Sequence, residues 1–142
     1  MILLHYDRET SETNALGRLL GVIGNIVRCE DEEESTINYK HVFQTLQPLM
    51  THDDDYICKS SCWTIADCIL NKKNTLVQLA IDMNIAHSAM HKLRRTAPES
   101  RVQACRVLIN LLERGTNKQK QLCIFYHHHH HYHTCHIVDT RF

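Results

Sequence analysis

Three polar residues recur at nearly equal intervals and offer the clearest hydrogen-bonding chemistry in the sequence. Asn25, Asp67 and Asn110 are 42 and 43 residues apart, and each is the seventh residue of a largely apolar nine-residue segment. The three segments, which align without gaps, are residues 19–27, 61–69 and 104–112. A carboxamide donates and accepts hydrogen bonds at once, whereas an ionised carboxylate only accepts. The pattern indicates a structural repeat with one polar side chain at a fixed place in each unit.

An indole and a guanidinium occupy the third position of the later segments. Trp63 stands there in the second segment and Arg106 in the third, whereas the first segment has Gly21. The face of an indole attracts cations, with about 0.5 to 2 kcal/mol per contact. A nucleophile, a base and an orienting group do not recur at any interpretable spacing. We therefore expect a binding protein, not an enzyme, and no cofactor.

A histidine tract near the end of the chain raises the question of metal binding. Residues 127–131 are five consecutive histidines, and the further candidate ligands are Cys123, His133, Cys135 and His136. Imidazole and thiolate bind zinc in tetrahedral sites, but this spacing matches no closed zinc module. A low-complexity histidine tract binds divalent metals without a built geometry. We expect no specific metal site, and a metal-binding protein is kept as a third function that chelator-insensitive folding would exclude.

Charge and composition restrict the class of partner. Sixteen basic and sixteen acidic residues cancel, so no long-range field attracts nucleic acid or an anionic membrane. No apolar run approaches the roughly 18 residues of a membrane-spanning helix, and no signal peptide is recognisable. Seven cysteines, an odd number with scattered spacing, favour reduced thiols. We expect a protein of the cytoplasm and nucleus.

Helices are expected to position the recurring residues. Only four glycines and two prolines interrupt the 142 residues, which favours an all-α fold. The interval of 42 to 43 residues lies in the armadillo and HEAT range. Two further helices are expected ahead of the second segment, at residues 33–39 and 42–50. Two more are expected ahead of the third segment, at residues 75–83 and 85–93. Three helices per repeat are typical of an armadillo superhelix, although Pro48 should kink or delay the helix at residues 42–50.

Polar connectors divide the chain into units. Acidic or polar runs separate the apolar stretches, and we interpret them as solvated linkers and first-turn charges. We predict a partial repeat at residues 1–28 and complete repeats at residues 29–71 and 72–115. Residues 116–142 are predicted to be a diverged, poorly ordered tail.

Four short motifs make the sequence resemble importin-alpha, a family of armadillo-repeat nuclear import adaptors. They are GNIV at residues 24–27, SCWTI at residues 61–65, AIDMNI at residues 80–85 and RVQAC at residues 101–105. In that family the corresponding stretches read approximately GNIVTG, ACWTISNI, VIDANI and RKEAAWAITN. The resemblance runs in order over residues 14–115 and corresponds to the family's minor site for nuclear-localisation signals.

The resemblance implies a role for each recurring residue. In the family, the third helices line a concave groove, asparagines hold the backbone of an extended peptide, and tryptophans stack on its lysine stems. Asn25 and Asn110 match the asparagines, and Trp63 matches a tryptophan. We therefore expect these residues and Asp67 on one concave face, where they would bind a lysine-rich nuclear-localisation peptide.

Five positions depart from the family's pattern. Asp67 replaces an asparagine, Gly21 and Arg106 stand where the family has Arg and Trp, and Ser60 and Gln103 replace glutamates. Arg106 belongs to the predicted peptide-binding set by its position, yet it places a positive charge where a lysine-rich peptide would lie. We therefore expect an affinity far below the family's, and we interpret the Arg106 side chain as solvated.

An armadillo scaffold that has lost signal binding and contacts another protein is the alternative function. In that case Trp63 would only pack between helices, and Asn25 and Asn110 would cap or bridge them. The chain shows no arginine- and lysine-rich segment of the kind with which the family engages importin-beta. With little more than two repeats, both ends of the core should be exposed, which favours marginal stability and self-association.

Overall fold

Every regular element in the described part of the protein is a helix. The computed structural model describes residues 2–30, 36–71, 75–94 and 97–124. Its elements are α1 (Ile2–Cys29), α2 (Tyr39–Leu46), the 3-10 helix η2 (Pro48–Thr51), α3 (Asp55–Asn71), α4 (Thr75–Asp82), α5 (Ile85–Lys92) and α6 (Pro98–Arg114). Residues 117–124 form one more short helix, and these ranges contain no strand. The all-α prediction is confirmed.

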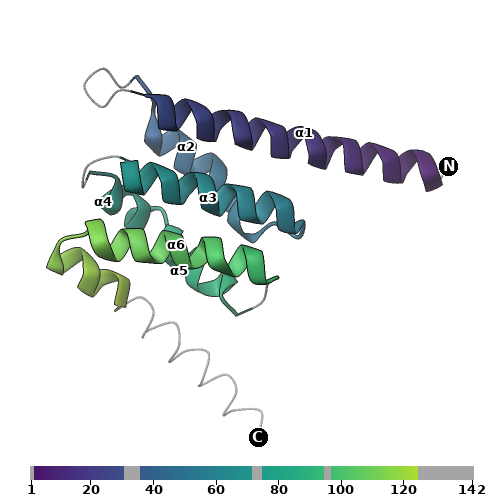
Figure 1. Cartoon of the computed structure of the whole chain (residues 1–142). Helices are drawn as coiled ribbons and strands as arrows, with labels where there is room; N and C mark the ends of the chain where they lie inside the picture. The colour runs from purple at the N-terminus through teal and green to yellow at the C-terminus, as the bar shows by residue number, and fades with distance from the viewer. Residues whose placement is uncertain (1, 31–35, 72–74, 95–96, 125–142) are drawn as a thin grey trace, which may run out of the picture.

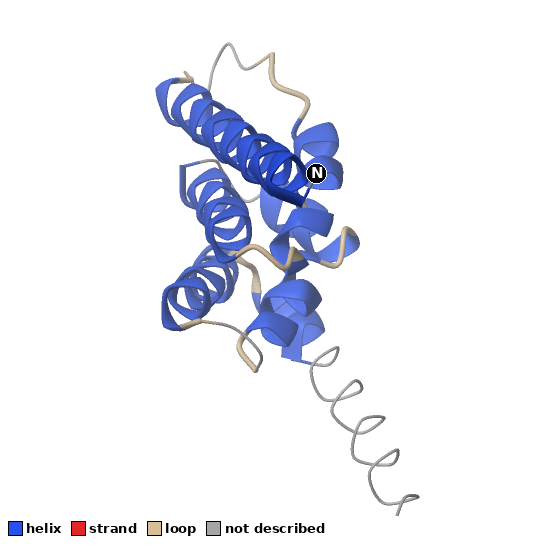
Figure 2. Ribbon diagram, turned by 90° about the vertical axis from the view of Figure 1, so that its right-hand side faces the viewer, coloured by secondary structure: helices blue, strands red, loops and turns tan. Residues whose placement is uncertain are grey.

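The three long helices lie side by side in one layer. Figure 1 shows α1, α3 and α6 running in the same direction, and α3 contacts both of the others. The shorter elements α2, η2, α4 and α5 form a second layer, which Figure 2 shows beside the first. Each long helix contains one of the three aligned segments. The polar residues of the sequence repeat therefore stand on adjacent helices of a single layer.

The apolar core lies between the two layers. Phe43, Met50, Ile57, Ile65 and Ile85 are fully buried, and complete burial of a large apolar side chain stabilises the fold by about 1.5 to 3 kcal/mol. The central helix α3 packs on both sides and presents small buried residues to its neighbours. These small residues include Ser61, Cys62, Ala66 and Cys68. Because the distance between packed helices depends on the side chains at the contact, small residues allow α1 and α6 to lie close to α3.

Side-chain caps start several helices at the positions where the structure begins them. The Asp54 carboxylate accepts from two backbone N–H groups in the first turn of α3, at 3.0 and 3.1 Å. Asn38 accepts from the first turn of α2 at 3.1 Å. Thr116 and Gln119 each accept from the other's backbone N–H, at 3.2 and 2.9 Å, which is the capping box of the helix at residues 117–124. These caps satisfy N–H groups that a helix cannot pair internally.

The helix expected at residues 42–50 has different bounds. α2 begins at Tyr39 and ends at Leu46, and Pro48 then starts η2. Proline lacks a backbone N–H and its ring clashes with the preceding turn, so the α-helix stops before it. The expected interruption at Pro48 is present, but the expected late start is wrong.

The shorter helix expected at residues 33–39 is not formed where the structure describes it. Residues 36–38 are not helical, and residues 31–35 lie outside the described ranges. The matching pair in the next unit is close to the prediction, since α4 and α5 cover residues 75–82 and 85–92. Asn84 joins these two helices in the left-handed conformation, with φ of 60°. Asparagine tolerates this region better than most residues.

Candidate functional site

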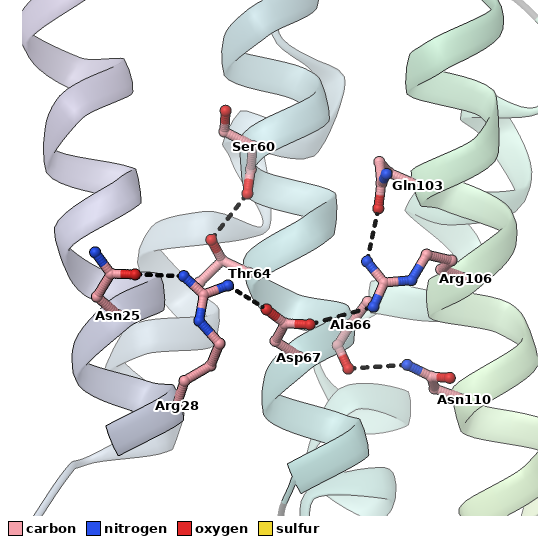
Figure 3. Close-up of polar contacts among 9 residues, drawn as sticks. All are labelled: Asn25, Arg28, Ser60, Thr64, Ala66, Asp67, Gln103, Arg106 and Asn110. Atoms are coloured by element: carbon pink, nitrogen blue, oxygen red, sulfur yellow. Dashed lines mark hydrogen bonds and ion pairs between the residues drawn. The ribbon is translucent and has the colours of Figure 1, made fainter. Parts of the chain in front are cut away.

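A buried carboxylate connects the three long helices. Asp67 lies on α3, and its side chain is 8% exposed. Its Oδ2 accepts from Arg28 of α1 at 2.9 Å, and its Oδ1 accepts from Arg106 of α6 at 3.2 Å (Figure 3). Both carboxylate oxygens are therefore engaged by guanidinium groups from neighbouring helices. We call Arg28, Asp67 and Arg106 the Asp67 cluster.

The interpretation of Arg106 as a solvated residue is wrong. Besides its ion pair with Asp67, Arg106 Nη1 donates to Gln103 Oε1 at 3.0 Å. Only 34% of its side chain is exposed. The side chains at positions 67, 103 and 106 thus form one network, in which the Asp67 carboxylate pairs with the Arg106 guanidinium.

Arg28 also covers the residue that was expected to attract a foreign cation. Its guanidinium carbon lies over the Trp63 ring, 4.9 Å from the centroid, which is within cation–π range. Arg28 also donates to Asn25 Oδ1. The Trp63 residue nevertheless stays 42% exposed. The indole therefore does attract a cation, and in this structure the cation belongs to the chain itself.

Sequence reasoning missed Arg28, although a signal for it exists. Arg28 precedes Asp67 by 39 residues, and Arg106 follows Asp67 by 39 residues. The two spacings are equal and are close to the repeat interval of 42 to 43 residues. This pattern is expected when arginines from the preceding and the following long helix both pair with one central carboxylate. The pattern is recognisable only when Asp67 is considered as the anion between two cations, and not as the equivalent of Asn25 and Asn110.

The predicted row of polar residues is brought together across the three helices. Figure 3 shows Asn25, Asp67 and Asn110 on α1, α3 and α6, at neighbouring positions. Asn25 is exposed, whereas Asn110 is 7% exposed and its Nδ2 donates to the Ala66 carbonyl at 2.9 Å. Asn110 therefore bridges two helices, as one of the alternatives from the sequence proposed. Contact of this row with a peptide stays a prediction.

Trp63 lines two clefts of different charge. The cleft between α1 and α3 has a volume of about 150 Å³ and is bounded by the glycine-rich side of α1, Arg28, Tyr56 and Lys59. The cleft between α3 and α6 has a volume of about 330 Å³ and is lined by Lys59, Trp63, Glu99, Val102 and Gln103. Arg28 and Lys59 make the first cleft basic, with no carboxylate among its lining residues. Glu99 gives the second cleft an acidic group.

Glu99 is a weakly held carboxylate. Its Oε2 accepts from Lys59 Nζ at 3.2 Å, and its side chain is 80% exposed. Ion pairs this open to water contribute about 0 to 1 kcal/mol. A cation from another molecule could therefore replace Lys59 at little cost.

Within the described residues no three side chains of the metal-ligating types come together. The candidate zinc ligand Cys123 is buried, and burial raises the pKa of its thiol, which disfavours the thiolate that metals bind. His133, Cys135 and His136 lie outside the described residues. The described part of the chain contains no disulfide between its cysteines. It also has no helix long and apolar enough to cross a membrane.

No protein-family model matches the chain, and no curated protein matches it. The resemblance to importin-alpha therefore depends on the sequence motifs alone.

Proposed function

We propose that this chain is an importin-alpha-like armadillo-repeat unit that binds lysine-rich nuclear-localisation peptides weakly, in the cytoplasm and nucleus. The observation that carries the proposal is the guanidinium of Arg28 over the half-exposed Trp63 indole, at 4.9 Å. This contact indicates that the environment of Trp63 is suited to a long cationic side chain. The parallel arrangement of α1, α3 and α6 supports an armadillo-type groove.

The cleft between α3 and α6 fits the cationic side chain of such a peptide. Trp63 and Val102 offer apolar surface for the methylene stem of a lysine, and Glu99 offers a carboxylate for its ammonium group. Stacking on the indole would contribute about 0.5 to 2 kcal/mol. Displacing Lys59 from Glu99 would cost about 0 to 1 kcal/mol, because that pair is exposed. The balance favours binding, but only slightly.

The Asp67 cluster explains why the affinity should be low. Two guanidiniums share one carboxylate, so the cluster has a net positive charge beside the cleft. Both oxygens of Asp67 are already engaged and are not available to a peptide lysine. A basic peptide therefore meets repulsion from Arg106 and competition from Arg28.

Titration calorimetry with a lysine-rich nuclear-localisation peptide at low salt tests this function. Trp63→Ala should raise Kd by about 2- to 30-fold, which corresponds to the loss of one cation–π contact. Arg106→Trp should lower Kd, because it removes a like charge and adds an indole face. Arg106→Gln separates the two effects, since it removes the charge alone. No detectable heat with the Arg106→Trp variant would contradict the proposal.

A matched control locates the peptide. Tyr56 lines the cleft between α1 and α3 and a neighbouring hollow beside Lys59 and Glu99, but it does not line the cleft that contains Trp63 and Val102. Tyr56→Ala should therefore leave the peptide affinity within about 2-fold of wild type. An equal loss with Tyr56→Ala and Trp63→Ala would move the peptide to the basic cleft.

The basic cleft itself favours the second candidate, a scaffold that contacts a different kind of protein segment. Arg28 and Lys59 flank apolar walls formed by Leu20 and Tyr56. This combination suits an apolar side chain next to a carboxylate better than a lysine. A peptide in which glutamates replace the lysines distinguishes the candidates, and tighter binding of the glutamate peptide would favour the scaffold.

A further inference from the structure

The outer side of α1 carries a stripe of exposed apolar residues. Leu19, Val22 and Ile26 are 59%, 53% and 55% exposed, and their spacing of three and four residues places them on one side of the helix. The other side of α1 faces α3, where Leu20 and Val27 are buried. We call Leu19, Val22 and Ile26 the α1 end face.

A second stripe lies at the opposite edge of the layer, on α6. Ile109 and Leu112 are 50% and 40% exposed, and Val102, which also borders the cleft to α3, is 56% exposed. Next to Leu112 an open apolar groove of about 160 Å³ continues onto Cys123 and Ile124 of the last described helix. We call Val102, Ile109 and Leu112 the α6 end face.

The positions equivalent to the α1 end face in the other two long helices are buried. The gapless alignment assigns its three positions to Ser61, Thr64 and Cys68 in α3 and to Ala104, Val107 and Leu111 in α6. All of these equivalents are at most 3% exposed. In α3, Thr64 lies next to Gly24 of α1, since an added Cβ at Gly24 would be 3.5 Å from its Oγ1. The middle position of the three is therefore one with which a long helix packs on the helix before it, while Leu111 also borders the apolar groove beside Leu112.

In the contact between two consecutive long helices, the α6 end face corresponds to the surface of the earlier helix. Its three positions are equivalent to Lys59, Ala66 and Ile69 in α3 and to Gly17, Gly24 and Val27 in α1. The following helix contacts them in both cases. Tyr56 of α3 lies against Gly17, Glu99 of α6 pairs with Lys59 at 3.2 Å, and Asn110 of α6 donates to the Ala66 carbonyl at 2.9 Å. These positions therefore receive the next helix.

We propose that this chain associates head-to-tail with further copies of itself, the α1 end face of one copy packing on the α6 end face of another. One more step of the internal repeat would place Val22 of one copy against Ile109 of the next, as Thr64 lies against Gly24. The same step would place Asn25 near the Ile109 carbonyl, as Asn110 lies near the Ala66 carbonyl. The occupant is a second copy because each face is apolar and has the register that the other requires.

The interface is heterologous, so every open assembly keeps one free face of each kind. Such contacts do not close after two copies unless the rotation between them forms a ring. The mean mass should therefore rise continuously with concentration instead of reaching a plateau at a dimer.

Sedimentation of the full chain at several concentrations, with two complementary variants, tests the proposal. Val22→Glu blocks the α1 end face and Ile109→Glu blocks the α6 end face. Both side chains are half exposed, so each variant should fold, and circular dichroism checks this. Gln44→Glu on α2 adds the same charge at an exposed position in the other layer and serves as the matched control.

The wild type and Gln44→Glu should increase in mass with concentration, whereas each blocked variant alone should stay monomeric. An equimolar mixture of the two blocked variants should form dimers and nothing larger, because each partner supplies the face that the other lacks. A wild type that is monomeric at all concentrations would overturn the proposal. The proposal would also be overturned if the two blocked variants fold but do not form dimers when mixed. Association that Val22→Glu and Ile109→Glu leave unchanged would overturn it as well.

Discussion

Asp67 links two arginines from different helices, and this link determines what its neighbours can bind. The carboxylate is nearly buried, whereas about a third of each guanidinium side chain is exposed. Each ion pair is therefore worth only about 1 kcal/mol, in the range of exposed pairs. Removing the carboxylate should cost more than one such pair, because two cations would then lie together beside Trp63 without their shared anion.

We predict that Asp67→Asn lowers the free energy of unfolding by about 1 to 3 kcal/mol, since the amide has one acceptor oxygen and no charge for the two guanidiniums. Urea denaturation followed by circular dichroism measures the change. Asp82→Asn is the matched control, because Asp82 is an exposed carboxylate that accepts from Gln78 on the same helix. Equal stability losses in the two variants would show that the Asp67 cluster has no special role.

At the scale of elements, the ends of the helices follow local chemistry more closely than the repeat pattern does. Pro48 stops α2 and starts η2, so this unit has a 3-10 helix where the next unit has part of an α-helix. In the following unit, Asn84 makes a turn at a different place, between α4 and α5, with a positive φ of 60°. The two units therefore reach a similar packing of their long helices through different connections.

For the turn at Asn84, we predict that Asn84→Ala lowers the free energy of unfolding by about 1 kcal/mol, because alanine lacks the short polar side chain that lets asparagine adopt the left-handed region. Asn84→Gly should stay close to wild type, since glycine adopts this region readily. Gln44→Ala, at an exposed position inside α2, provides the control and should change stability by less than about 0.5 kcal/mol. Chemical denaturation measures all three, and an alanine variant as stable as the glycine variant would contradict the argument.

At the scale of the whole molecule, both edges of the long-helix layer are apolar and exposed. Each repeat of a solenoid buries its apolar face mainly against its neighbours, so a short array gains little from its outer faces. The core between the two layers is buried, but Leu19, Val22 and Ile26 on one edge of the long-helix layer and Ile109 and Leu112 on the other stay exposed.

We therefore predict a marginally stable chain whose melting temperature rises with its concentration, because association stabilises only the folded state. Thermal unfolding by circular dichroism at several concentrations, together with sedimentation, measures both properties. Blocking the α1 end face with Val22→Glu should remove the concentration dependence. A monomer with one sharp transition above about 65 °C, the upper edge for typical mesophile domains, would contradict the prediction.

The helical class could be predicted from the sequence, and so could the places of the three long helices. Few glycines and prolines favour helices, and the interval between Asn25, Asp67 and Asn110 identified the three helices that lie side by side. Both signals are local or periodic, so they can be recognised without knowing which residues touch. The start of α2 was missed, because the repeat register placed it at residue 42, whereas the Asn38 cap starts the helix at Tyr39.

The connections within the candidate site could not be predicted in the same way. The sequence placed Asp67 and Arg106 as separate replacements in a row, and it did not single out Arg28. Packing of the long helices brings residues 39 positions apart within hydrogen-bonding distance, so the two arginines share one carboxylate and Arg28 lies over Trp63. Such pairing depends on the lateral offset between helices, which side-chain packing sets, so the 39-residue spacing acquires its meaning only once the structure places Asp67 between the two arginines.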